Sequence, residues 1–282
     1  MNTPSPVSID EPLRGIIIPP QPKIINDLLT AQANPNCEAE DIAVIVEQDI
    51  GLAGSILKTV NSPYFGLKNT ISNIKQAVSL LGIANVTNIA NGLALKKTFS
   101  DETGAALEEF WKVSNATANI ATAISKQLGI ASTDLAYSLG LFHNCGIPLM
   151  AMKHQDYFSV LEEAYHLPDG RLVDTENKHY KANHAVVGFY TAKAWHLPDA
   201  LCDVIAEHHS LEKHFGENVD KEAHHTELVA LLKMAEHIAK TAEILGHASE
   251  DLEWQHYGHR ILEFVGLSED DFHEMEVSIN GY

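Results

Sequence analysis

Residues 105–145, AALEEFWKVSNATANIATAISKQLGIASTDLAYSLGLFHNC, decide the fold class of this chain. The first part of this stretch repeats at helical spacing, and one stripe contains Phe110, Val113, Thr117, Ile120, Ile124 and Leu128. Gly129 ends the predicted helix, and a second helix follows and leads to His143. Gly146 and Pro148 then interrupt or end that second helix. Two consecutive helices with apolar faces predict a helical core.

The remaining sequence also predicts helices. Five short helices are expected between residues 24 and 99, with Asp49 and Ser72 as caps at helix starts and Gly82 at a helix end. Further helices are expected over 156–165, 175–195, 199–209, 226–245 and 251–265. No sustained alternation of polar and apolar residues argues for a sheet. The sequence therefore predicts an all-α protein, in which a compact N-terminal helical bundle packs on a larger helical core.

The charge is distributed unevenly along the 282 residues. The net charge is -19; residues 1–100 hold 7 Lys and Arg against 8 Asp and Glu, and the rest holds 12 against 30. A strongly acidic surface repels nucleic-acid phosphates, whose binding depends on Lys and Arg. We therefore expect no nucleic-acid partner, and the nearly neutral N-terminal part is the better candidate for a surface that binds another protein.

The sequence also indicates where in the cell the protein is expected. No stretch approaches the roughly 20 apolar residues of a membrane span, and the first residues lack the basic and apolar regions of a signal peptide. The three cysteines, Cys37, Cys145 and Cys202, are odd in number and widely separated, which does not indicate a disulfide framework. These features predict a cytoplasmic protein that does not enter a membrane. They indicate no particular oligomeric state.

Several strings, taken together and in order, resemble the HDOD family, an HD-related output domain of bacterial signalling proteins. They are IPPQP at 18–22, VEQD at 46–49, ILKTVNSPYFG at 56–66, ISNIKQAVSLLG at 71–82, FW at 110–111, and the segment from His184 to His209 that contains WHLP at 195–198. One departure is Ile50, where the family often has proline after the aspartate. The resemblance covers roughly residues 14–210.

The resemblance implies an all-α fold related to the HD-type metal-dependent phosphohydrolases. From the resemblance and from the longer helices that begin near Thr103, we expect an N-terminal extension over 1–13 and the N-terminal helical part of the HDOD region over 14–102. The HD-like helical part is expected over 103–266, and an acidic C-terminal tail over 267–282.

The resemblance also implies where metal ligands of an HD site fall in this chain. The early histidine of such a site falls at Val113, and the His-Asp pair falls on His143 and Asn144. Val113 cannot ligate a metal, and Asn144 lacks the charge that balances a divalent cation. The residues that could still hold metal are His143, His184, His208, His209 and Glu236.

These changes predict little or no catalysis. We expect at most one weakly bound divalent transition metal in a vestigial site, and the carbonyl oxygen of Asn144 is assigned to substrate or ligand binding. The alternative for His143 is a hydrogen-bonded histidine at a helix end. For His214, His224 and His225, in a polar connection rich in Glu, we expect solvated loop positions.

The resulting functional hypothesis is a bacterial signal-transduction protein that acts by binding a protein partner. The candidate partner-binding residues are Tyr64, Phe65, Lys68 and Lys75, in a turn-rich connection of the neutral N-terminal part. In the alternative interpretation, Tyr64, Phe65 and Leu67 all fill the interface between the two parts of the chain. Two other functions stay open: a metal-dependent phosphohydrolase with an altered ligand set, and a small-ligand sensor that uses the vestigial cavity.

Overall fold

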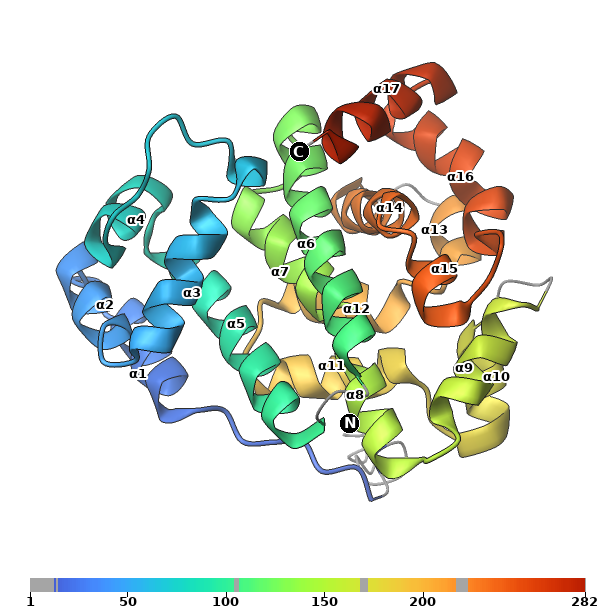
Figure 1. Ribbon diagram of the computed structural model, residues 1–282, viewed down its shortest axis with the longest axis horizontal. Coiled ribbons are helices and arrows are strands. Elements are labelled where there is room, and N and C mark those ends of the chain that lie inside the picture. Colours follow the sequence, from blue (N-terminus) through green and yellow to red (C-terminus); the bar gives the residue numbers. More distant parts are fainter. Residues whose placement is uncertain (1–12, 14, 104–106, 168–171, 217–222, 282) are drawn as a thin grey trace, which may run out of the picture.

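A computed structural model of the chain describes residues 13, 15–103, 107–167, 172–216 and 223–281. These residues form helices and connections without any strand, so the all-α prediction is confirmed (Figure 1). None of the described helices is both long enough and apolar enough to cross a lipid bilayer. Most of the expected N-terminal extension and the expected helix start at Ala105 lie outside the described residues.

The N-terminal helices pack as a bundle. They are α1 (Lys23–Gln32), α2 (Ala39–Val46), α3 (Ile50–Val60), the 3-10 turn η1 (Pro63–Phe65), α4 (Ile74–Leu81) and α5 (Ile83–Thr103). The Leu52 N–H donates to the Asp49 side chain over 3.0 Å, which confirms Asp49 as the cap of α3. The expectation for Ser72 is wrong, because the cap of α4 is Asn73, whose side chain accepts from the Gln76 N–H.

The remaining helices surround α6 and α7 (Figure 1). In chain order they are α6 (Glu108–Leu128), α7 (Thr133–Phe142), α8 (Gly146–Lys153), α9 (Tyr157–Tyr165), α10 (Leu172–Tyr180), α11 (His184–Ala194), α12 (Asp199–Glu207), α13 (Leu211–Phe215), α14 (Ala223–Ile238), α15 (Thr241–Gly246), α16 (Leu252–Val265) and α17 (Glu269–Asn280). Helix α6 packs against α7 and α14, and α8 packs against α11. These contacts bring the ends of α7, α11 and α12 towards α14.

Three segments differ from the structure that the sequence predicts for them. The helix expected over 175–195 is divided into α10 and α11, because Lys181 has φ 59° and Asn183 starts a new helix as its cap. The helix expected over 226–245 is divided at Lys240, which has φ 56°. The acidic tail is not merely a solvated segment. It forms α17, whose acidic first turn follows a Ser268 capping box and whose inner face buries Phe272, Met275 and Ile279.

The N-terminal bundle is tied to the rest of the chain through α5, which packs on α1 to α4 on one side and on α7 and α8 on the other. The Pro-rich lead adds a second connection. The Trp195 indole N–H donates to the Pro19 carbonyl over 2.9 Å, and the Gln21 and Asn91 side-chain amides donate to the Trp195 carbonyl. Trp195 is fully buried, so these bonds fix the end of α11 against the bundle.

Candidate metal centre

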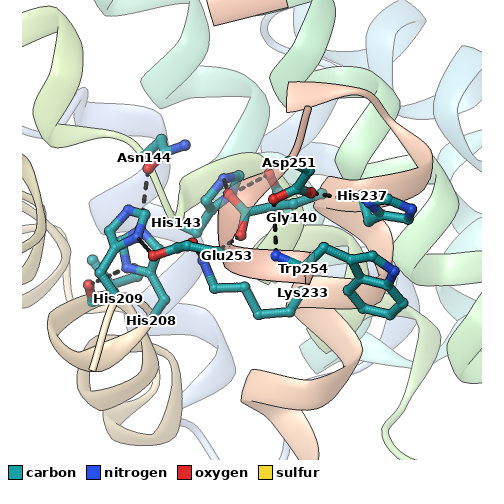
Figure 2. A network of polar contacts seen from close by, with 12 residues as sticks. Gly140, His143, Asn144, His208, His209, Lys233, His237, Asp251, Glu253 and Trp254 are labelled. Atoms are coloured by element: carbon teal, nitrogen blue, oxygen red, sulfur yellow. Dashed lines mark hydrogen bonds and ion pairs between the residues drawn. The ribbon is translucent and has the colours of Figure 1, made fainter. Parts of the chain in front are cut away.

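His143 lies in the buried turn between α7 and α8. Its Nδ1 lies 2.8 Å from the Gly140 carbonyl oxygen, so the Nδ1–H donates there (Figure 2). Its Nε2 lies 3.2 Å from Glu236 Oε1 on α14. Helix α7 can approach this closely because residue 140 has no side chain. A Cβ atom on Gly140 would lie 2.5 Å from the Ala118 Cα atom of α6. The sequence-predicted pair His143 and Glu236 is therefore brought together.

Three other histidines converge beside this pair. His184 is the first residue of α11, and His208 and His209 follow the last residue of α12. One ring nitrogen from each lies within 4.8 Å of the other two, and the Nε2 atoms of His184 and His209 are 3.1 Å apart. All three imidazoles are buried.

The opposite ring nitrogens each face an oxygen. Glu176 lies 2.7 Å from His184 Nδ1, Glu253 lies 2.7 Å from His209 Nδ1, and the Ile205 carbonyl lies 2.8 Å from His208 Nδ1. These oxygens accept the Nδ1 protons, so neutral rings turn their Nε2 lone pairs into one space. Two lone pairs at 3.1 Å repel each other unless a proton or a cation lies between them. Histidines that ligate a metal are oriented in this way by carboxylates and carbonyls behind them.

The protonation of the cluster suits a metal. Burial, followed by the charges of the neighbouring histidines and Lys233, holds the pKa of His208 well below its usual range. Burial and Lys233 do the same to the pKa of His209. Both rings are therefore neutral at pH 7, which is the form that ligates metal ions.

Asn144 contacts His208 rather than an open cavity. Its side-chain oxygen Oδ1 lies 3.2 Å from His208 Nε2 (Figure 2). Because this ring nitrogen has one lone pair, a metal ion bound at His208 Nε2 would replace the contact with Asn144.

Lys233 is the principal site residue that the sequence did not indicate. Its Nζ atom lies 2.8 Å from Glu236 Oε2 and 2.8 Å from Glu253 Oε2, and its side chain is only 5% exposed. Burial alone would lower the pKa of Lys233, but Glu236 and Glu253 raise it above its usual value. Burial would raise the pKa of Glu236, but Lys233 and His143 hold it well below its usual range.

Lys233 thus joins the two histidine groups into one network. The network runs from His143 through Glu236, Lys233 and Glu253 to His209, and it continues through His184 to Glu176 and Tyr157. The Tyr157 hydroxyl donates to Glu176 Oε1 over 2.5 Å. A cavity of about 20 Å³ lies beside Lys233, lined in part by His209, Glu236 and Thr241. Such a volume is close to that of a single water molecule.

The structure places the other predicted residues as follows. Val113 is buried on α6, in the packing position expected from its apolar stripe. Phe65 is only 4% exposed and packs against Tyr137, with ring centroids 6.0 Å apart. The prediction that Phe65 is available to bind a partner is therefore wrong. Tyr64 is partly buried, Lys68 is exposed, and Lys75 is exposed but pairs with Glu40. The aromatic Phe65 follows the alternative of filling the interface.

Comparison with known proteins decides the family. The model of the HDOD domain matches residues 18–211. The chain belongs to the HDOD family. The chain is 26% identical over 206 residues to an uncharacterized protein of Treponema pallidum, and the match covers 69% of this chain but only 38% of that longer protein.

Solved structures share the fold of this HDOD protein. An HDOD domain protein of unknown function from Geobacter sulfurreducens gives a TM-score of 0.67 at 23% identity, covering 95% of this chain and 90% of that one. A candidate metal-dependent phosphohydrolase of Shewanella amazonensis gives 0.61 at 20% identity, with 94% and 93% covered. The phosphohydrolase name belongs to the Shewanella protein. At 20–23% identity, the likeness shows only that this chain shares the fold of these two proteins.

The three-histidine cluster fits one metal ion. His184, His208 and His209 offer three imidazole nitrogens, a donor set that Zn²⁺ accepts, and each ring is oriented by an oxygen behind it. The resemblance implies two further ligands at positions 113 and 144, where the chain has Val and Asn. The same region already contains the Lys233 ammonium, which repels a metal cation.

Proposed function

We propose that this HDOD protein is a regulatory module that binds a protein partner and has little or no hydrolytic activity. The observation that carries the proposal is the buried Lys233 ammonium, held 2.8 Å from both Glu236 and Glu253. The Lys233 ammonium is a side chain of the protein itself, and it provides the positive charge that balances these two buried carboxylates. An HD hydrolase uses metal cations in that role, together with the water that they activate.

The remaining ligands support the same proposal. Glu236 is engaged by Lys233 and His143, so its two oxygens are not free to bridge metals. Asn144 is engaged by His208. The network links charged groups of several helices, and we propose that its main role is to fix α11, α12, α14 and α16 relative to one another.

The three-histidine cluster should hold at most one transition metal ion. We expect elemental analysis of gently purified His209→Gln protein to show at most one equivalent of transition metal less than the wild-type protein contains. The His259→Gln protein is the matched control, because His259 is exposed on α16. A loss of two equivalents in His209→Gln would mean that a two-metal centre is present and that the ligands are assigned wrongly.

The proposed partner surface is a groove between η1 and α4. The groove has a volume of about 540 Å³, and it is lined by Gly66, Leu67, Lys68, Asn69, Ile71, Gln76, Ser79 and Leu80. Leu80 is 58% exposed, and Lys68 is the one charged residue in this lining. Lys75 and Tyr64 lie in the neighbouring sequence. An acidic partner segment with an apolar side chain suits such a groove.

Charge reversal tests the partner surface. We expect Lys68→Glu combined with Lys75→Glu to weaken capture of the partner from host cells at least tenfold. The melting temperature should hardly change, because exposed substitutions usually alter stability by no more than about 0.5 kcal/mol. Lys112→Glu, on the exposed face of α6, is the control. Retained binding in the double variant, with loss in the Lys112 variant, would place the partner site on the second part of the chain.

A metal-dependent phosphohydrolase is the second candidate. The three neutral histidines favour it, because they could bind an ion that activates water. The assay that separates the two candidates measures turnover that depends on His143.

A further inference from the structure

A second histidine–carboxylate cluster lies where α12, α13 and α14 meet. Glu207 is the last residue of α12, His214 is on α13, and His225 is in the first turn of α14. His214 Nε2 lies 3.3 Å from Glu207 Oε2, and the His214 and His225 ring centroids are 5.6 Å apart. His214 is only 6% exposed, so the expectation of a solvated loop residue is wrong for it.

Three potential ligand atoms in this cluster have no hydrogen-bond partner among the described residues. They are Glu207 Oε2, His214 Nε2 and His225 Nε2, and each is buried. Buried side-chain polar atoms nearly always have a partner, so an unpartnered one calls for an explanation such as an ion or a water. Here three of them, all of types that ligate metals, come from three different helices.

Outer contacts orient two of these groups. Lys213 Nζ binds the other oxygen of Glu207, Oε1, over 2.5 Å. The Thr226 hydroxyl lies 3.4 Å from Nδ1 of His214 and can accept its proton. With the proton on Nδ1, the Nε2 lone pair of a neutral ring and Glu207 Oε2 face each other, as two ligands of one cation do.

We propose that Glu207, His214 and His225 bind one divalent transition ion of the Zn²⁺ class. Two imidazole nitrogens and a carboxylate oxygen form a donor set that Zn²⁺ uses, with bonds of about 2.0–2.2 Å. Neighbouring ligands around a tetrahedral ion with such bonds are about 3.3 Å apart, and the Glu207–His214 separation is 3.3 Å. The ring centroid of the half-buried His225 lies 5.6 Å from that of His214, so binding of the third ligand requires the His225 side chain to turn towards the ion.

Such an ion would act on the main centre through the backbone. Glu207 directly precedes His208 and His209, so an ion that fixes Glu207 to α13 and α14 also fixes the end of α12 that presents those two rings. The site is separate from the three-histidine cluster and from the groove beside α4. It therefore stands or fails independently of the proposed function.

Titration of the metal-free protein with Zn²⁺ against a chromophoric chelator tests this site. We expect the wild-type protein to bind one more equivalent than His214→Gln/His225→Gln, and His225→Gln alone to bind that equivalent at least tenfold more weakly. His259→Gln should match the wild type. If circular dichroism shows that the double variant does not fold, the single His225 variant decides, since His225 is only half-buried.

Identical stoichiometry and affinity in the wild type and the His225 variant would overturn the site and leave a buried water as the partner of these atoms. Loss of the equivalent in His259→Gln would also overturn it, because the ion would then be bound at an exposed histidine. Neither result would change the hydrolysis expected of the main centre.

Discussion

Replacing Lys233 with methionine is expected to lower the free energy of unfolding by about 3–5 kcal/mol, the range found when one partner of a buried ion pair is removed. Methionine fills similar space but leaves Glu236 and Glu253 buried without the ammonium that lies 2.8 Å from each. Chemical denaturation monitored by circular dichroism measures the effect. The melting temperature should fall by on the order of 10 °C.

The chain offers a matched control for this change. Lys112 also lies between two glutamates, at 3.1 Å from Glu108 and 2.8 Å from Glu109, but all three side chains are exposed. Solvent screens such exposed pairs, so Lys112→Met should be nearly neutral in stability. If the Lys233 variant were as stable as the Lys112 variant, the buried ammonium would not be the charge that holds this centre together.

Replacing Gly146 with alanine is expected to destabilise the protein by about 3 kcal/mol, at the upper end of the usual cost of overpacking. A Cβ atom at residue 146 would lie 2.0 Å from the His184 carbonyl oxygen and 2.8 Å from the Gly188 N atom. Both obstacles are backbone atoms of α11, so α8 and α11 must separate. Because His184 begins α11, metal bound to the three histidines should also be weakened.

Gly54→Ala is the control for the Gly146 substitution. Gly54 lies in α3, and a Cβ atom there meets nothing within 4 Å. Alanine in an open helical position stabilises by about 0.5–1 kcal/mol relative to glycine. Equal denaturation midpoints for the two variants would mean that α8 and α11 are not packed as closely as the structure places them.

The helical fold could be predicted from the sequence, because periodic apolar faces and local caps determine most of its elements. Asp49 is an example, since an N-cap acts within three residues of itself. The divisions at Lys181 and Lys240 could not be predicted, because both are non-glycine residues in left-handed conformation that packing imposes. The helix α17 was missed because its acidic residues conceal the small buried face of Phe272, Met275 and Ile279.

The site could be predicted only in part. The resemblance to HD proteins indicated His143, His184, His208, His209 and Glu236, and the structure places them in one buried region. The roles of Glu176 and Glu253 depend on contacts with histidines 8 and 44 positions away, which no local pattern reports. Lys233 had one weak signal, its i,i+3 spacing from Glu236, and lysine is rarely buried.

Hydrolysis that depends on His143 tests the central claim most directly. Purified wild-type and His143→Ala proteins should be assayed with phosphomonoesters, phosphodiesters and nucleotides, each with added Mg²⁺, Mn²⁺, Fe²⁺ or Zn²⁺. Because Val113 and Asn144 stand where the resemblance implies ligands, and Lys233 is bound to Glu236, we expect both proteins to show the same turnover, no higher than the metal-only blank. Metal-dependent turnover by the wild type that disappears in His143→Ala would contradict the account and establish the phosphohydrolase instead.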